Sequence, residues 1–426
     1  MKELAAGTFS RLKKTKIVSN FFNLSSIQLS NALLMILLYP VITRIVGLEA
    51  FGLIMLANAF AGLLGIVVNF GTSQSGIKDV AVHKSDPGNL SRVFYNTLLI
   101  RALIFLVFIL LFSLAGMGNF VHYSYYLFAL PLILAEVLNP MFLYLGTEKL
   151  AMFNMANLLG KVLIILAIIF FIKGASDAVW VNFLIGGVNS LIYIFLLVRG
   201  IRHYKLPFTI PAKADMLQLS KSNFYLVGNN ISVHLQQSLM LFALARWGNP
   251  MWLGAYSLCD KITWSSRLLI MSISNSVYPK AAWLFSEDVR LFLGFKNRIK
   301  TMLTLTFLGV SVGMMIFAGP IIHLIAGEPN ETAVTILRIM SLVPAAAALN
   351  CLNVLELLIR ENNRSIFSIA MVLLALAFSL AFGISILKNI YLLAAYTLVI
   401  ELSAIMMYEY VIRKEYPVYI TTGQEL

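Results

Sequence analysis

Five basic side chains interrupt long apolar stretches of this sequence: Arg101, Lys161, Lys261, Arg267 and Arg338. A charge in the middle of a membrane-spanning helix costs about 2.5–3.5 kcal/mol on insertion scales, so it requires a polar cavity, a partner or a route to the interface. Guanidinium and ammonium groups are good donors to phosphate oxygens. These residues therefore predict a sheltered binding site for an anionic, phosphate-bearing ligand.

The same five residues could instead have purely structural roles. Arg101 and Arg338 lie nearer the ends of their segments, where a long side chain could extend to the interface. Lys161, Lys261 and Arg267 could form ion pairs inside the helix bundle.

Three acidic residues in mid-segment are the available partners: Glu136, Asp260 and Glu401. Asp260 and Arg267 are seven residues apart, which places them on one face of a helix, two turns from each other. Each carboxylate could balance a cation or carry a coupling proton or cation, and the sequence alone does not separate these roles.

Polar residues are dense in the first and the seventh apolar segments, which favours a shared cavity lining. The candidates are Asn23, Gln28, Asn31, Asn230, His234, Gln236 and Gln237. Hydrogen bonding between helices is the alternative role for these side chains.

The sequence contains no recognisable catalytic or metal-binding pattern. A phosphate-binding glycine-rich loop with its lysine, an HExxH motif and a clustered Cys/His pattern are all missing from it. We therefore expect a chain that is not an enzyme, with no resident metal or cofactor, although proton or cation coupling remains open.

Composition sets the class of protein in which these residues must work. Of the 426 residues 60% are hydrophobic and 12% are charged, against about 45–50% and about 25% in ordinary soluble domains. A soluble enzyme, a secreted disulfide scaffold and a disordered chain are excluded, because none could cover so much apolar surface. The sequence predicts an all-α polytopic membrane protein.

Long continuous apolar runs predict about twelve transmembrane helices. Their expected ranges are 19–43, 51–73, 93–115, 124–145, 151–172, 178–198, 222–245, 251–273, 300–322, 332–356, 365–387 and 389–411.

The distribution of basic residues predicts the orientation of these helices. With the N-terminus in the cytoplasm, 23 of the 32 basic residues fall in cytoplasmic segments, and positive charge is typical of that side. Only Arg44, Lys173, Arg246 and Lys388 fall in outer loops. Both termini are therefore expected in the cytoplasm, and the net charge of +13 is assigned to the membrane topology rather than to nucleic-acid binding.

A short motif recurs in the two halves of the chain. Arg44, Gly47 and Gly52 correspond to Arg246, Gly248 and Gly254, at offsets of 202, 201 and 202 residues. Six helices separate the copies, so the halves have the same orientation, which is a parallel repeat. We expect a six-helix bundle at 1–205, a cytoplasmic linker at 206–221 and a second six-helix bundle at 222–426.

Several stretches resemble Wzx-type polysaccharide flippases. They are Asn20–Phe22, Pro40–Gly47 with Phe51-Gly52, Asn139–Lys149, Gly254–Ser257, Asp260–Ile262 and Tyr278-Pro279. Two positions depart from the family pattern. Phe142 stands where a tryptophan is frequent, and Gln236 and Gln237 stand where an acidic residue is frequent, which leaves proton coupling in that helix in doubt.

The resemblance implies membership of the multidrug/oligosaccharidyl-lipid/polysaccharide (MOP) exporter superfamily, with a MATE-like V of two bundles around a central cavity. It implies a flippase that moves an undecaprenyl-diphosphate-linked oligosaccharide unit across the bacterial cytoplasmic membrane by alternating access. The implied partners are the lipid-linked sugar, membrane lipids and, in the same pathway, a polysaccharide polymerase and assembly proteins.

Two further functions are compatible with a polytopic membrane protein of this length. A MATE-type multidrug cation antiporter would require a predominantly acidic, aromatic cavity, which the embedded basic residues disfavour. A membrane-embedded polysaccharide polymerase would require long outer loops, and the predicted outer loops are short.

Overall fold

The computed structural model describes residues 37–116, 121–210 and 213–415, and helices account for the regular structure of these ranges. In the first half the helices are Leu37–Val46, α2 (Leu48–Asn69), α3 (Thr72–His83), α4 (Pro87–Ala115), α5 (Tyr123–Leu127), α6 (Leu130–Leu138), α7 (Met141–Gly146), α8 (Leu150–Phe171), the 3-10 turn η1 (Ala175–Asp177) and α9 (Trp180–Tyr204). In the second half they are α10 (Lys213–Trp247), α11 (Pro250–Glu287), α12 (Val289–Ile316), α13 (Ala318–Ala326), α14 (Glu331–Met340), α15 (Val343–Ile359), α16 (Asn363–Leu387) and α17 (Ile390–Glu415).

Each predicted crossing corresponds to one helix or to a run of consecutive helices. The first crossing is described only from Leu37 onward. Within the described ranges, nine helical segments are long and apolar enough to cross a membrane. α10 and α11 are not among them although they have 35 and 38 residues. Their polar and charged side chains lower the hydropathy, and these two helices carry seven of the fifteen predicted site residues.

Four predicted crossings are interrupted helices. In the crossing 300–322, α12 ends at Ile316 and α13 begins at Ala318. Between α2 and α3 the chain passes through Phe70 and Gly71, whose φ angles are 49° and 69°. Between α6 and α7 the interruption falls at Asn139-Pro140, where proline removes a backbone donor and disfavours helix at the residue before it. Glu331–Ile359 is likewise divided into α14 and α15.

The reversal from α3 to α4 is fixed by a capping residue. The Asp86 carboxylate accepts hydrogen bonds from the backbone N–H groups of Gly88 (2.9 Å) and Asn89 (3.3 Å), next to Pro87 in the first turn of α4. These bonds stabilise the ionised form and hold the pKa of Asp86 below its ordinary value.

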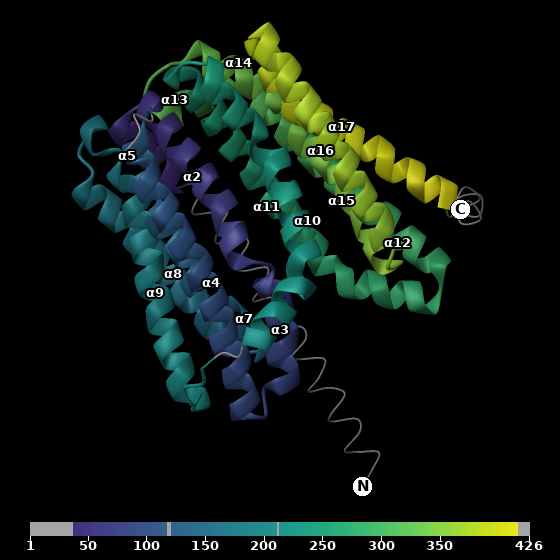
Figure 1. The fold of residues 1–426 in the computed structure, drawn as a ribbon. Helices are drawn as coiled ribbons and strands as arrows, with labels where there is room; N and C mark the ends of the chain where they lie inside the picture. Colours follow the sequence, from purple (N-terminus) through teal and green to yellow (C-terminus); the bar gives the residue numbers. More distant parts are fainter. Residues whose placement is uncertain (1–36, 117–120, 211–212, 416–426) are drawn as a thin grey trace.

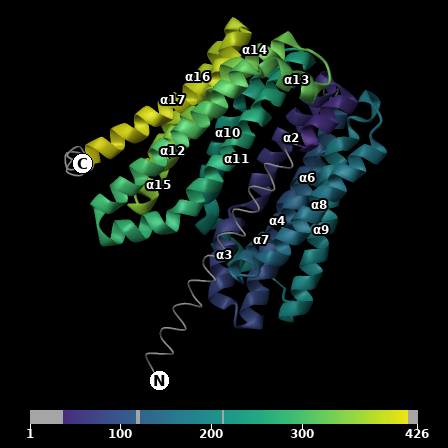
Figure 2. The same ribbon diagram turned by 180° about the vertical axis from the view of Figure 1, so that it is seen from behind.

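Two groups of helices form a V, as Figures 1 and 2 show. The arm with α2 to α9 and the arm with α10 to α17 meet at the end that carries α13 and α14, and they diverge toward the α3–α4 turn and the α11–α12 turn (Figure 1). We call these the closed end and the open end. α10 begins at Lys213, so the stretch 206–221 expected to be a linker already contains its first residues.

The core at the closed end is shared by both arms. Ile42 and Phe51 from the first arm pack in one apolar cluster with Met240, Leu253 and Ala255 from the second, and each of the five is at most 3% exposed. α2 and α11 form the most extensive helix–helix contact of the described residues. The recurring glycines Gly52 and Gly254 lie in this contact, so equivalent positions of the two halves pack against each other.

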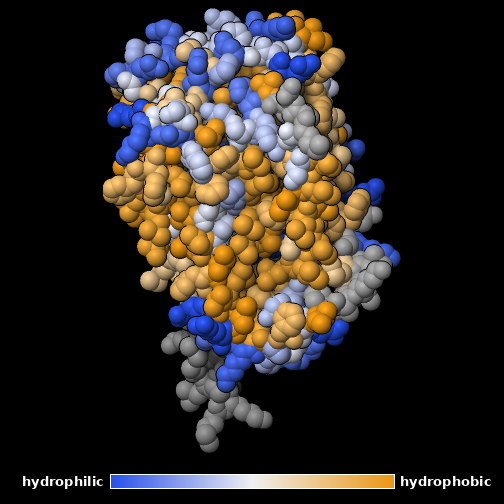
Figure 3. Space-filling model, turned by 60° about the vertical axis from the view of Figure 1, so that its left-hand side comes forward, coloured by the Kyte–Doolittle hydropathy of each residue, from blue (hydrophilic) through white to orange (hydrophobic). Residues whose placement is uncertain are grey.

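The outer surface has the pattern of a membrane protein. Figure 3 shows a broad apolar band around the middle of the molecule, between ends where hydrophilic residues gather. Large apolar side chains such as Leu110, Phe170, Phe195 and Phe382 are more than half exposed, which a soluble protein would not present in such number.

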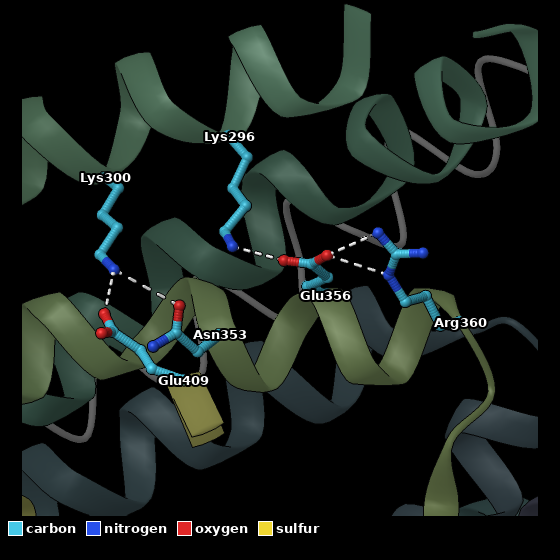
Figure 4. A network of polar contacts seen from close by, with 6 residues as sticks. All are labelled: Lys296, Lys300, Asn353, Glu356, Arg360 and Glu409. Atoms are coloured by element: carbon cyan, nitrogen blue, oxygen red, sulfur yellow. Dashed lines mark hydrogen bonds and ion pairs between the residues drawn. The ribbon is translucent and has the colours of Figure 1, made fainter. Parts of the chain in front are cut away.

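A polar network holds three helices of the second arm together (Figure 4). Glu356 of α15 is 1% exposed and accepts hydrogen bonds from Lys296 of α12 and from Arg360, with an Arg360 Nε–Oε1 distance of 2.9 Å. Lys300 of α12 donates to Glu409 of α17 at 3.0 Å. The buried carboxylate of Glu356 is therefore fully paired inside the arm, as a buried charge must be to avoid a large desolvation cost.

Candidate functional site

A central cavity of about 370 Å³ lies between α2 of the first arm and five helices of the second arm. Four charged side chains line it: Asp260, Lys261 and Arg267 on α11, and Glu401 on α17. All four were predicted from the sequence as embedded charges, and the structure brings them to one space. Aromatic side chains complete the lining, namely Tyr256, Trp264, Tyr396 and Tyr408.

The cations of this cavity are paired with its carboxylates. Arg267 forms an ion pair with Glu401 across the α11–α17 contact, and the Arg267 guanidinium also lies 5.8 Å from the centre of the Trp264 ring. Lys261 Nζ lies 3.4 Å from the carboxylate of its neighbour Asp260. All four side chains are partly exposed, between 12% and 28%. The described lining is therefore balanced in charge, and a ligand anion would compete with two carboxylates for two cations.

A second cavity of about 420 Å³, which we call the amide-lined cavity, adjoins the first. It lies between α2, α3 and α6 of the first arm and α10 of the second. Its lining is Gly62, Gly65, Ile66, Asn69, Ser73, Gln74, Glu136, Asn230, Val233, His234 and Gln237. The two cavities share Gly62, Val233, His234 and Gln237.

His234 stands at the junction of these cavities and joins the two arms. Its Nε2 lies 3.0 Å from the backbone carbonyl of Ala59 on α2. Because a carbonyl oxygen only accepts, we assign the proton of the neutral ring to Nε2. The ring occupies space opened by Gly62, since a Cβ there would lie 3.0 Å from His234 Cε1.

A third cavity, of about 520 Å³, lies on the other side of α11, between helix Leu37–Val46 and α13. Its lining is mostly apolar and includes Leu37, Val41, Ile262 and Leu324. Lys261 lines both this groove and the central cavity.

A family model described as "Polysaccharide biosynthesis protein" matches residues 17–284, which is more than half of the chain. The chain belongs to this family.

Relatives and solved structures agree with that assignment. The chain is 21% identical over 361 residues to a putative O-antigen transporter of Escherichia coli (strain K12), a match that covers 83% of this chain and 86% of the relative. It is 22% identical over 351 residues to a putative O-antigen transporter of Shigella dysenteriae, covering 80% and 85%.

The fold is that of the MOP superfamily. A lipid II flippase, MurJ, in an inward closed conformation aligns with a TM-score of 0.72 at 14% identity, covering 93% of this chain and 87% of that one. An inward-facing multidrug resistance MATE family transporter of the MOP superfamily aligns with a TM-score of 0.69 at 12% identity, covering 92% and 98%. The predicted MATE-like architecture is thereby confirmed.

The two departures from the family pattern have local structural roles in this member. Phe142 is fully buried in α7, and the guanidinium carbon of Arg101 lies 5.2 Å from the centre of its ring. Gln236 donates from Nε2 to the carbonyl of Ala370 at 2.8 Å and so ties α10 to α16, whereas Gln237 is exposed toward both cavities.

The other predicted basic residues lie apart from the cavities described above. Arg101 is fully buried in the first arm and donates to Thr72 Oγ1 (2.8 Å) and to the carbonyls of Glu136 (3.2 Å) and Asn139 (2.9 Å). Lys161 is 8% exposed on α8, and Arg338 is exposed on α14. Ligand contacts by these three residues remain predictions, while Lys261 and Arg267 line the central cavity.

Some residues that line the cavities were not predicted from the sequence, and some predicted lining residues lie outside the ranges that the structure describes. Asn23, Gln28 and Asn31 lie outside the described residues. Asn58, Asn69 and Gln74 line the cavities from α2 and α3. The available signal was a pair of asparagines, one in the middle and one at the end of α2, on one face of a mostly apolar helix. Within the described ranges, His, Cys, Asp and Glu form no group of three or more that could hold a metal ion.

Proposed function

We propose that this chain moves an undecaprenyl-diphosphate-linked oligosaccharide across the bacterial cytoplasmic membrane by alternating access, with the diphosphate bound in the central cavity. Membership of a polysaccharide biosynthesis family and relatives named as putative O-antigen transporters support a lipid-linked sugar as substrate. The observation that carries the proposal is the position of Lys261 and Arg267 in a cavity between the arms of the V.

The diphosphate would replace carboxylates as the partner of these cations. The N–H groups of Arg267 and Lys261 already point at oxygen acceptors. These acceptors are the carboxylates of Glu401 and Asp260. A diphosphate offers more oxygens and more negative charge than either carboxylate, so exchange keeps both cations paired. Asp260 and Glu401 would then be left without partners in a sheltered cavity, which favours uptake of a proton or a cation and offers a route to coupling.

The lipid tail would remain outside the polar cavities. The apolar groove between helix Leu37–Val46, α11 and α13 supports a path for it, because Lys261 lines both the groove and the central cavity. A headgroup at Lys261 could then keep its hydrocarbon chain in apolar surroundings while the phosphates are bound.

The orientation that we propose places the open end and both termini in the cytoplasm. The basic residues outside the predicted crossings gather on the segments assigned to that side, including the helix ends around the α3–α4 turn and the α11–α12 turn. In this orientation the described structure would accept its substrate from the cytoplasmic side.

A second candidate function is export of an organic cation. It is favoured by the four aromatic side chains and two carboxylates of the central cavity, since aromatic faces and carboxylates attract cations. It gives no role to Lys261 and Arg267 as ligands.

The test is transport by purified full-length protein in vesicles. A fluorescent undecaprenyl diphosphate carrying one N-acetylglucosamine is followed across the bilayer by its loss of protection from a membrane-impermeant quencher. We expect transport by the wild type and a loss of about tenfold or more in Lys261→Gln and Arg267→Gln, equivalent to about 1.4 kcal/mol. The exposed residues Lys388 and Arg364 provide matched controls in Lys388→Gln and Arg364→Gln.

Competition separates the two candidate functions. Tetraphenylphosphonium, a small organic cation, should leave transport of the lipid unchanged if the site binds a diphosphate. Because tetraphenylphosphonium also crosses a bilayer unaided, its accumulation is compared with that in protein-free vesicles. Accumulation above that level without movement of the lipid would favour the cation exporter and reject the flippase.

A further inference from the structure

The amide-lined cavity has a chemistry different from that of the central cavity. Five of its side chains are amides or hydroxyls that can both donate and accept hydrogen bonds: Asn69, Ser73, Gln74, Asn230 and Gln237. Paired donors and acceptors at fixed spacing suit the vicinal hydroxyl groups of a sugar ring, each of which also donates and accepts. The volume of about 420 Å³ lies within the range of small-molecule sites, about 300–1,000 Å³.

The hydrogen bonds of this cavity are weak or local, so a ligand could replace them. Asn69 donates to Ser73 Oγ at 2.6 Å within the α2–α3 corner. Asn230 of α10 reaches Gln74 of α3 at 3.5 Å, across the gap between the arms. Gln237 is exposed on the α10 side. A sugar bound here would contact both arms at once.

Glu136 is the one charged side chain of the described lining. Its side chain lies against Gly65 of α2, where a Cβ would come within 3.0 Å of Glu136 Cγ. Its backbone carbonyl accepts a hydrogen bond from Arg101 at 3.2 Å, and the positive charge of Arg101 favours the ionised form of the Glu136 carboxylate. Arg101 itself is fully buried and does not line the cavity. A ligand in this cavity therefore meets a carboxylate and no cation of the described lining.

We propose that the amide-lined cavity binds the sugar next to the diphosphate, and that Glu136 selects an uncharged, hydroxylated ring over an acidic one. This proposal rests on the proposed function. The two cavities adjoin each other and share Gly62, Val233, His234 and Gln237 in their linings, so the sugar of a diphosphate held by Lys261 and Arg267 would lie at this position. A carboxylate on that sugar would be repelled by Glu136, whereas hydroxyl groups would donate to it.

The experiment compares three probes for binding to the purified full chain in lipid nanodiscs. The probes are undecaprenyl diphosphate alone, the same lipid carrying N-acetylglucosamine, and the same lipid carrying glucuronic acid. We expect the wild type to bind the N-acetylglucosamine lipid about tenfold or more tightly than the glucuronic acid lipid, a ratio equivalent to about 1.4 kcal/mol. Glu136→Gln should remove most of that preference.

Two further variants test whether the side chains of this cavity contact the sugar and whether the effect is specific to Glu136. Gln74→Leu changes an exposed side chain that lines the amide-lined cavity but not the central cavity. It should weaken both sugar-bearing lipids while leaving the affinity for sugar-free undecaprenyl diphosphate unchanged. Glu148→Gln is the matched control for Glu136→Gln, because Glu148 forms an exposed ion pair with Lys84 at 3.2 Å, away from the cavities described above.

The possible failures are distinct. A wild type that binds all three lipids equally, or a preference that survives Glu136→Gln, overturns the sugar site and leaves the diphosphate site standing. A wild type that does not bind sugar-free undecaprenyl diphosphate overturns the diphosphate site and, with it, the sugar site.

Discussion

Gly52 and Gly254, equivalent residues of the two halves of the chain, face each other at the closed end of the V. A Cβ on Gly52 would lie 2.5 Å from the backbone nitrogen of Gly254, and a Cβ on Gly254 would lie 1.9 Å from the carbonyl oxygen of Leu48. Any larger residue must therefore push the backbones of α2 and α11 apart. The alternating access that we propose requires the arms to separate at the closed end, and therefore requires this contact to open.

Gly254→Ala should destabilise the closed end. Overpacking of this kind costs about 1–3 kcal/mol, so we expect a lower melting temperature and greater accessibility of the α2–α11 contact in hydrogen exchange. Gly309→Ala on α12 is the control, because a Cβ there meets nothing within 4 Å and alanine favours helix. Equal melting temperatures for the two variants would show that the contact is not close-packed.

Arg101→Met should act on folding rather than on ligand binding. The substitution removes the donors to Thr72 Oγ1 and to two backbone carbonyls of the α6–α7 region, and hydrogen bonds from a charged group contribute about 1.5–3 kcal/mol each. We expect a marked fall in melting temperature, with the affinity of the remaining folded protein for a lipid diphosphate unchanged. A variant of normal stability that fails to bind would instead make Arg101 a ligand.

Glu356→Gln should loosen the second arm. Lys296 and Arg360 share this nearly buried carboxylate, and removal of one partner from a buried ion pair costs about 3–5 kcal/mol. Thermal unfolding followed by circular dichroism measures the loss. Glu287→Gln, at an exposed position at the end of α11, should melt like the wild type. If Glu356→Gln does the same, the network contributes nothing to stability.

The fold was predictable from the sequence because long apolar runs have few alternatives in a bilayer. Each predicted crossing has a corresponding helix or run of helices. The recurrence of Gly52 and Gly254 was visible in the sequence, but the contact between them was not predicted. The interruptions of the helices were not predicted. Hydropathy does not register a change of backbone angle such as that at Phe70 and Gly71, since an apolar run looks the same whether it is straight or broken.

The site was predictable only in part. Embedded charge identified Asp260, Lys261, Arg267 and Glu401, but an isolated sequence cannot show which charges pair, so the charge balance of the cavity emerged only from the structure. Arg101 is likewise a basic residue within a long apolar stretch, but it is fully buried inside the first arm. A buried cation bound to backbone carbonyls and a cation that lines a cavity are indistinguishable until the packing around them is known.

The most direct test of the central claim measures binding of a short-chain prenyl diphosphate to purified protein by calorimetry, in the wild type and in Lys261→Gln, Arg267→Gln and Arg364→Gln. We expect each of the first two substitutions to weaken binding about tenfold or more, equivalent to about 1.4 kcal/mol, and Arg364→Gln to leave it unchanged. Wild-type affinity in both Lys261→Gln and Arg267→Gln would contradict the account, because the diphosphate would then be held without the cations of the central cavity.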